Sequence, residues 1–353
     1  MQESLLDRQK HILSHLIDLY VEPAQPVGSR TLARVGHFNL SPATIRNEMS
    51  GLEERGYITH PHTSSGRVPT DKGYRFYVDA VPEPAGLDSE LLRKIKRHFQ
   101  AKIRDLEDLA RLSSKVLAGL TEQAAIVLYP QPDRLCLNRV DLFFVDRRQV
   151  LVVWSSTSGF EANRLVDVGG EVLSPDLLKR ITYLLNDELQ GVRFSEAEPH
   201  MLEVLLKRRD ALAKVQALVD VILKQSIGQA SLPNYTLNGG EHLLDKPEFQ
   251  DVRILRRVMH LLTTEDRPEN PWWLLVQKDL EACRLRVHIG AENPEALQDM
   301  ALVVHPYEFG GASAGAFVLV GPRRMAYREV ITAVRHVSHV FSENVERLNR
   351  SFG

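Results

Sequence analysis

The sequence has few of the features by which secreted proteins and membrane proteins are usually recognised. It contains only two cysteines in 353 residues, Cys136 and Cys283, and no CxxC spacing. Neither a disulfide scaffold nor a thiolate metal site is therefore expected. No apolar run approaches the roughly 20 residues of a membrane helix, and the N-terminus has no signal-peptide core. We expect a cytoplasmic chain with free thiols and no membrane contact.

Common catalytic motifs are also missing: the sequence has no Walker A loop and no GxSxG nucleophile elbow. Residues 310–315, GGASAG, lie between two expected strands, which favours a hairpin turn over a phosphate-binding loop. His60 and His62 flank a proline without Cys or carboxylate ligands at metal spacing. His336 and His339 share a helical face, where a solvated or core role is expected. We expect no enzymatic activity, no metal and no cofactor.

Excess charge of one sign is a third absence. The net charge is −2, with 43% hydrophobic and 25% charged residues, which is ordinary for a globular protein. This balance argues against a protein that coats nucleic acid, but it leaves room for a local basic surface. The length predicts two or three domains.

The first eighty residues carry the most informative pattern. Residues 5–20 have apolar positions at helical spacing, and Pro23 and Pro26 end that helix. Ser29 is expected to cap a short helix over 30–35, and Ser41 to cap a third helix with Pro42 in its first turn. Residues 57–60 and 67–70 then read as two short strands joined by a small polar tip. Together they predict a winged helix-turn-helix over residues 1–80.

The third helix has the side chains of a DNA-reading surface. Ile45, Met49 and Leu52 recur at core-facing spacing, which leaves Arg46 and Asn47 open with Ala43, Thr44 and Ser50. Arg can bond guanine bidentately, Asn can do so with adenine, and Ala or a Thr methyl can touch a thymine methyl. The wing is expected to lie along the backbone or in a minor groove, with Arg67 directed towards DNA.

The charge of this region is locally basic although its total is balanced. Residues 1–80 hold nine Lys and Arg and nine Asp and Glu, but residues 27–47 contain three arginines and no acid. A purely structural or protein-binding winged helix is the less favoured alternative. The expected DNA-binding residues are Ser29, Arg30, Thr31, Ser41, Ala43, Thr44, Arg46, Asn47, Thr63, Ser64, Ser65, Gly66 and Arg67.

Three long segments of this region resemble the bacterial heat-shock repressor HrcA family: PVGSRTLA at 26–33, LSPATIRNEMSGLEERGYI at 40–58 and PHTSSGRVPTDKGYRFYVD at 61–79. The resemblance continues at lower density in residues 289–303 and 320–331, and it departs locally at 33–42. It implies a homodimeric repressor of chaperone operons that binds an inverted-repeat operator in double-stranded DNA. It also implies that the GroEL chaperonin helps to keep the repressor active.

Beyond a short Pro-rich linker at 81–86, the pattern predicts alternating helices and strands. A long helix over 88–120 has an interrupted heptad signal, which suits either a dimer contact or packing on its own domain. A strand at 124–129 precedes an antiparallel meander of strands at 138–145, 149–155 and 160–168. The remaining expectations are helices at 174–190, 199–227, 247–262 and 325–348, a loop at 233–240, and strands at 272–277, 285–289, 301–307 and 315–320.

The expected fold class is therefore α+β multidomain, with one α/β unit interrupted by an independent block. The resemblance implies that residues 87–130 and 231–353 form a GAF-like domain, and that residues 131–230 form an inserted dimerising domain of three antiparallel strands and helices. Two other functions stay open: a ligand-sensing or enzymatic GAF-like protein with a regulatory DNA-binding head, and an interaction scaffold. A tightly bound small molecule would favour the first, and nucleic-acid binding insensitive to salt would favour the second.

Overall fold

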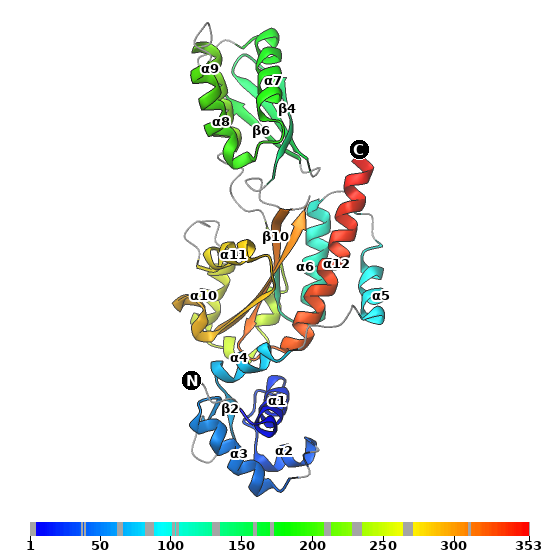
Figure 1. Ribbon diagram of the computed structural model, residues 1–353, viewed down its shortest axis with the longest axis vertical. Helices are drawn as coiled ribbons and strands as arrows, with labels where there is room; N and C mark the ends of the chain where they lie inside the picture. The colour runs from blue at the N-terminus through cyan, green and yellow to red at the C-terminus, as the bar shows by residue number, and fades with distance from the viewer. Residues whose placement is uncertain are drawn as a thin grey trace.

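The chain forms three parts in line (Figure 1). The winged helix, here called the head, lies at one end, a sheet flanked by helices is in the middle, and a smaller block of strands and helices is at the other end. The computed structural model describes residues 5–36, 38, 40–61, 66–81, 88–100, 103, 106–128, 135–157, 161–169, 173–207, 213–227, 235–263, 271–309 and 312–352.

The head has the predicted winged-helix order. Its elements are α1 (Asp7–Val21), α2 (Ser29–Val35), α3 (Pro42–Glu54), β1 (Ile58–Thr59), β2 (Val68–Pro69) and α4 (Asp71–Asp79). The two short strands pair antiparallel, with Ile58 opposite Pro69. Side chains from all four helices form one buried core, which includes Ile12, Leu16, Leu32, Ile45, Leu52 and Tyr74. This shared core fixes α3 relative to α1 and α4.

The middle part is a five-stranded antiparallel sheet in the order β7-β3-β10-β9-β8. The strands are β3 (Ala124–Leu128), β7 (Tyr235–Asn238), β8 (Arg286–Ile289), β9 (Met300–Phe309) and β10 (Ala312–Pro322). All five residues of β3 are buried, because helices cover both faces of the sheet. Strands from before and after the end block therefore belong to one sheet.

Two separate cores lie on the two faces of this sheet. One joins the sheet to α6 (Leu106–Thr121) and α12 (Tyr327–Phe352), with α5 (Ser89–His98) packed on the outer side of α12. The other joins it to α10 (Val252–Thr263) and α11 (Pro271–Ala282), and is centred on the adjacent Trp272 and Trp273. Short 3-10 turns connect these elements: η2 (Gly240–Leu243), η3 (Pro247–Phe249), η4 (Gly290–Glu292) and η5 (Glu295–Leu297).

The end block has its own antiparallel sheet in the order β4-β5-β6. Its strands are β4 (Leu137–Phe144), β5 (Gln149–Ser156) and β6 (Glu161–Asp167), and its helices are α7 (Pro175–Leu189), α8 (Phe194–Lys207) and α9 (Ala213–Ile227). Burial alternates along β5, so Val150, Val152 and Trp154 face the helices. The predicted meander is confirmed.

Four sequence expectations differ from the structure. The expected single helix over 88–120 is wrong: α5 and α6 are separate helices, and both pack on α12. The expected strand at 272–277 is wrong, because these residues belong to α11; a short buried apolar run does not distinguish strand from helix. The expected loop at 233–240 contains the edge strand β7. The expected helix at 247–262 begins as η3 and continues as α10 after a break.

The structure also shows the state of the two cysteines, the pairing of β9 with β10 and the burial of two histidines. Cys136 and Cys283 are both free. β9 and β10 pair antiparallel as far as Phe309 opposite Ala312, with a bulge between Ser313 and Gly315, and the first two residues of the predicted turn, 310 and 311, lie outside the described residues. His336 is fully buried, whereas His339 is exposed. Among the described residues, no helix combines the length and apolarity needed to cross a membrane.

Candidate nucleic-acid interface

The start of α3 is held by the cap that the sequence predicts. The hydroxyl of Ser41 accepts a hydrogen bond from the backbone N–H of Thr44 at 3.1 Å, and Pro42 occupies the first helical turn. The Thr44 hydroxyl lies 3.0 Å from that of Ser41. Both hydroxyls therefore sit at the positive end of the helix dipole, where a phosphate oxygen would be favoured.

The two faces of α3 separate as predicted. Ile45, Met49 and Leu52 are buried in the head core. Ala43, Arg46 and Asn47 are exposed. The side chains of Arg46 and Asn47 form no hydrogen bond or ion pair with another described residue, so this face of α3 is open to a ligand. The Ser50 hydroxyl instead donates to the backbone carbonyl of Arg46 at 3.1 Å.

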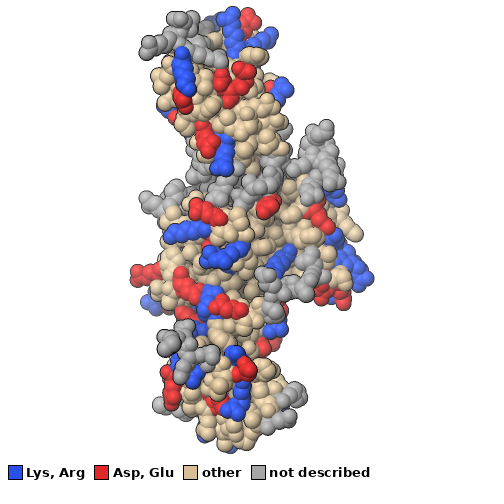
Figure 2. Space-filling model, in the orientation of Figure 1, with Lys and Arg blue, Asp and Glu red and all other residues tan. Residues whose placement is uncertain are grey.

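Two of the three acids on α3, Glu48 and Glu53, are paired within the head. Arg8 of α1 pairs with Glu48, and His60 and Arg67 both pair with Glu53. Each of these two carboxylates therefore has a basic partner within the head. Figure 2 shows both signs of charge interspersed over the visible face of the whole molecule, rather than one continuous basic surface. On this side of the molecule, positive charge is therefore local and not continuous.

The second helix begins one residue earlier than expected. Gly28 is the N-cap and Ser29 is already helical, so the expectation that Ser29 caps α2 is wrong. Glycine is tolerated at an N-cap because its backbone adopts the required conformation easily. Arg30, Thr31 and Arg34 are exposed, and Ser29 is half-buried. These exposed residues precede α3 and belong to the same helix-turn-helix.

The base of the wing packs on the chain before α2. The backbone groups of Arg67 and Val27 exchange two hydrogen bonds of 2.9 Å. A Cβ added to Gly66 would lie 2.6 Å from the backbone of Val27. The close approach of Val27 therefore explains, within the head alone, why position 66 holds a glycine.

Arg67 differs from the expectation that it leaves the wing towards DNA. Its guanidinium lies 2.9 Å from the Glu53 carboxylate, and only 17% of its side chain is exposed. Thr63, Ser64 and Ser65, which the sequence predicts at the tip of the wing, lie outside the described residues. The role of Glu53 was not predicted, because residues 14 apart in sequence give no local signal of pairing.

The comparisons with known proteins cover nearly the whole chain. Residues 4–80 match the family described as "Winged helix-turn-helix transcription repressor, HrcA DNA-binding". Residues 107–331 match the family described as "HrcA protein C terminal domain". The two matched regions correspond to the head and to most of the rest of the molecule.

Individual relatives agree with this assignment. The chain is 33% identical over 344 residues to a heat-inducible transcription repressor HrcA of Acetivibrio thermocellus, which covers 97% of each chain. It is 34% identical over 346 residues to the protein of that name from Natranaerobius thermophilus, covering 95% of this chain and 96% of the relative. A solved structure described only as a hypothetical protein, at 25% identity, matches 98% of this chain and 100% of its own with a TM-score of 0.62.

Proposed function

The chain belongs to the HrcA family of heat-inducible transcription repressors, and from this membership we propose that it represses chaperone operons by binding an inverted-repeat operator as a homodimer. The observation that carries the proposal is the exposed face of α3, where Arg46 and Asn47 lie open beside the Ser41 cap and their side chains form no hydrogen bond or ion pair with another described residue. The family is one of repressors, not of enzymes, in agreement with the absence of catalytic motifs.

In this proposal α3 lies in the major groove and reads bases with Arg46 and Asn47, while Ala43 meets a thymine methyl. The Ser41 and Thr44 hydroxyls bind a backbone phosphate at the helix N-terminus. Ser29, Arg30 and Thr31 flank the groove, and Thr63, Ser64, Ser65, Gly66 and Arg67 follow the backbone or the minor groove. For Arg67 this requires exchange of its Glu53 partner for phosphate, which is a charge-for-charge replacement.

The proposed domain division keeps the boundaries set by the sequence. Residues 1–80 form the DNA-binding head, residues 87–130 and 231–353 a GAF-like domain, and residues 131–230 an inserted dimerising domain. The shared sheet of β3, β7 and β10 supports this division, since β3 precedes the insertion and its two neighbours follow it. The proposed site of action is the cytoplasm, where the operator DNA of a bacterium lies.

The open face of the end block supports dimerisation there. Phe143, Leu151 and Leu165 are directly opposite one another on β4, β5 and β6, and form an apolar row across the sheet. Phe143 and Leu165 are 54% and 56% exposed. An antiparallel sheet usually solvates its free face through polar residues, so a row of this kind favours a self-complementary contact between two copies.

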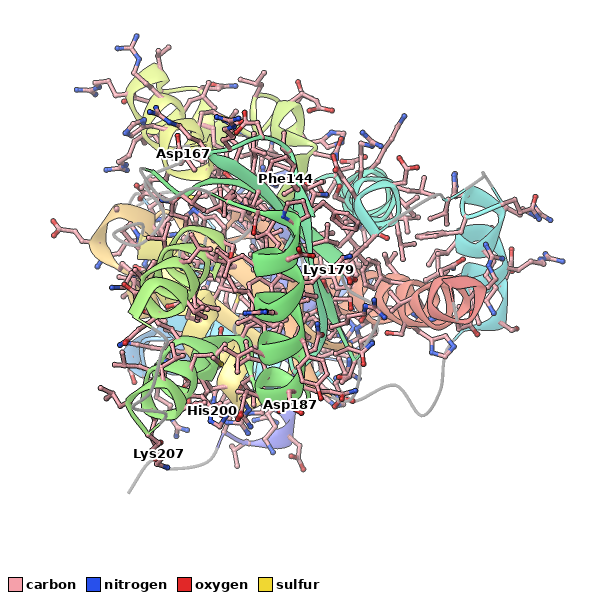
Figure 3. All side chains as sticks on the ribbon, turned by 90° about the horizontal axis from the view of Figure 1, so that it is seen from above. Phe144, Asp167, Lys179, Asp187, His200 and Lys207 are labelled. Carbon is pink, nitrogen blue, oxygen red and sulfur yellow. The ribbon has the colours of Figure 1, made fainter. Side chains whose placement is uncertain are left out.

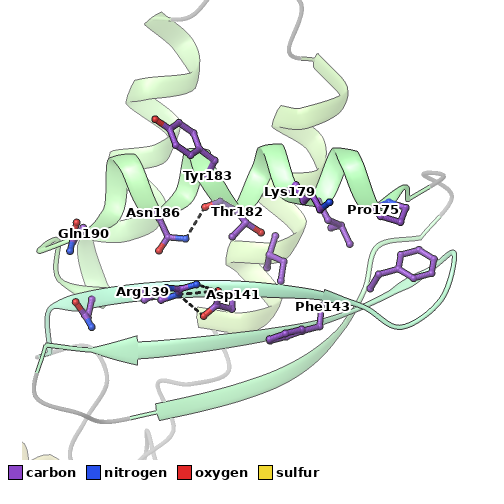
Figure 4. A pocket seen from close by; sticks show the side chains of 13 residues that line it. Arg139, Asp141, Phe143, Pro175, Lys179, Thr182, Tyr183, Asn186 and Gln190 are labelled. Carbon is purple, nitrogen blue, oxygen red and sulfur yellow. Dashed lines mark hydrogen bonds and ion pairs between the residues drawn. The ribbon is translucent and has the colours of Figure 1, made fainter. Parts of the chain in front are cut away.

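A groove beside this face extends the candidate contact. It has a volume of about 770 Å³ and runs between β4 and α7. Asn186 of α7 accepts a hydrogen bond from the backbone N–H of Val140 on the outer strand at 2.9 Å and donates one to its carbonyl at 2.7 Å, so these two edge groups need no partner strand. Figure 4 shows Asn186 among the residues that line the groove. Tyr183, 74% exposed, stands on the rim. In the view along the long axis, Lys179 and Asp187 mark α7 and Phe144 marks the end of β4 (Figure 3).

We further propose that the GroEL chaperonin modulates the repressor. Unfolded proteins would occupy the chaperonin during heat stress, so the repressor would lose its helper and the operons would be transcribed. This titration requires that only a small fraction of the repressor is active without help. Adding chaperonin with ATP to purified repressor should raise the fraction that binds operator, and adding an unfolded competitor should reverse the effect.

The experiment that tests the main proposal is footprinting of the purified full-length chain on the chaperone promoters of its own genome. We expect a protected inverted repeat that overlaps promoter elements, with both half-sites protected at the same protein concentration. Protection of no discrete site, or of a single half-site, would contradict the proposed operator.

A further inference from the structure

The head contacts the rest of the chain through a small joint formed by α4 and the end of α1. In Figure 1, α4 is the part of the head that lies next to the central sheet. Clefts of about 660 and 720 Å³ flank α4 on its two sides. Because these clefts separate the two parts on both sides, a few contacts at α4 and α1 determine how the head sits on the sheet.

The first contact is made by Asp71, at the start of α4. Its carboxylate lies 3.1 Å from Arg323 and accepts a hydrogen bond from the backbone N–H of Ala291 at 3.0 Å. The neighbouring Gly290 has φ +52°, and a Cβ there would lie 2.0 Å from the Asp71 carboxylate. The loop at η4 is thus shaped around this side chain from the head.

The second contact is made by Arg75, one turn along α4. Its guanidinium donates to both carboxylate oxygens of Glu292, with Nε 2.7 Å from Oε1, and to the backbone carbonyl of Val287 on β8. Glu292 is itself oriented by the backbone N–H of Ile289, at 2.9 Å. A bidentate Arg–carboxylate pair fixes orientation as well as distance. It therefore resists rotation of α4 relative to β8.

The third contact is made by Arg324, which follows β10 of the central part and reaches the head. Arg324 is 8% exposed, donates to the backbone carbonyl of Val21 at the end of α1, and pairs with Glu248 at 2.5 Å. A cation at a helix C-terminus is favoured by the helix dipole. Nearby, the buried rings of Tyr74 and Tyr327 lie 6.0 Å apart.

Further packing inside the head joins these contacts to α3, the helix proposed to read DNA bases. Tyr77 of α4 donates a hydrogen bond to Asp18 of α1 at 2.5 Å. α1 in turn packs against α3 in the head core. The direction in which Arg46 and Asn47 point is therefore set relative to β8 and α12 by Asp71, Arg75 and Arg324.

We propose that Asp71, Arg75 and Arg324, with their partners Arg323, Glu292 and Glu248, are positioning residues that set the half-site spacing the dimer accepts. The inference rests on the proposed function, because spacing has meaning only for a dimer on an inverted repeat. Two fixed recognition helices fit half-sites separated by whole turns of about 10 base pairs. Five extra base pairs turn one half-site to the opposite side of the duplex. A rigid joint makes that change costly, and a loosened joint makes it tolerable.

The test uses full-length protein and three duplexes: one half-site, the footprinted inverted repeat, and that repeat with five base pairs inserted at its centre. Arg75→Glu places a carboxylate beside Glu292 and Asp79 and opens the joint. Arg253→Glu is the matched control, since Arg253 is an exposed arginine on α10 that pairs with Asp251 outside the joint. The double variant Arg75→Glu with Glu292→Arg restores an opposite-charge pair.

For Arg75→Glu we expect unchanged affinity for the half-site duplex and roughly tenfold weaker binding to the native repeat, because the second half-site contributes through effective concentration. We also expect a smaller preference for the native repeat over the repeat with the insertion. The double variant should recover part of that preference. Equal spacing preference in Arg75→Glu and Arg253→Glu, or tighter binding to the native repeat, would overturn the proposal. If Arg75→Glu weakens binding to the half-site as much as binding to the native repeat, the substitution disturbs the folding of the head. In that case Glu292→Gln, which leaves the head sequence unchanged, must still reduce the preference for native spacing, or the proposal fails. If the wild-type chain does not prefer the repeat over a scrambled duplex, the proposed function itself fails.

Discussion

Arg46 offers the sharpest separation between DNA reading and protein stability. Its side chain is exposed on α3 and forms no hydrogen bond or ion pair with another described residue. Arg46→Ala should therefore change the free energy of unfolding by less than about 0.5 kcal/mol. If Arg46 bonds a guanine bidentately, the same change should cost about 1–3 kcal/mol on the cognate operator, which is about 5- to 150-fold in affinity.

The assay is a titration of labelled duplexes at several salt concentrations, with the cognate repeat and a scrambled duplex of equal length. Arg34→Ala is the matched control, because Arg34 is an exposed arginine on α2 outside the base-reading face. It should weaken both duplexes alike through lost phosphate contact. For Arg46→Ala we expect the loss on the cognate duplex only, with one base position relaxed. Equal losses on both duplexes would refute base reading by Arg46 and leave only a phosphate contact.

Three further predictions concern stability, pH and assembly. Ser41→Ala removes the N-cap of α3 and should lower the free energy of unfolding of the head by about 1 kcal/mol; Ser41→Asp, which keeps a cap acceptor, should not. Burial, and to a smaller extent the charge of Arg335, lower the pKa of His305 from an ordinary 6.5 to about 4. The imidazole of His305 therefore binds a proton more readily in the unfolded chain than in the folded one. As the pH falls from above 6.5 to 4, this difference should lower the free energy of unfolding by about 3 kcal/mol. Urea unfolding at pH 7 and pH 4 should show a smaller loss of stability in acid for His305→Asn than for the wild type. An identical loss would show that His305 does not cause the pH dependence. Leu165→Arg should dissociate the dimer in sedimentation experiments, whereas Leu202→Arg, the same change at an exposed site on α8, should not; dimers of both variants would place the interface elsewhere.

The local chemistry of the head was accessible from sequence because its signals act over a few residues. A serine followed by a proline begins α3, apolar residues three and four apart mark its buried face, and Gly56 follows its end with φ +76°. Arg46 and Asn47 could be placed by elimination once Ile45 and Met49 were assigned to the core. The shift of the α2 cap from Ser29 to Gly28 is within the uncertainty of helix ends.

The remaining differences arise from contacts between distant residues. Arg67 looked available for DNA, but its partner Glu53 is on another element. The heptad pattern after residue 88 predicted one continuous helix. It arises instead because two separate helices, α5 and α6, both pack their apolar faces on α12. Trp272 and Trp273 look like a strand in isolation, yet they pack as part of α11 on the sheet. Arg75 and Glu292 are 217 positions apart, so no periodicity could reveal the joint.

The most direct test of the central claim is the ratio of affinities of the full-length chain for its inverted-repeat operator and for a scrambled duplex, measured at near-physiological salt. Specific repressors typically bind their sites at least about 10³-fold more tightly than random DNA, and we predict a ratio of that order, which Arg46→Ala reduces. Equal affinity for the two duplexes would contradict operator recognition by this winged helix.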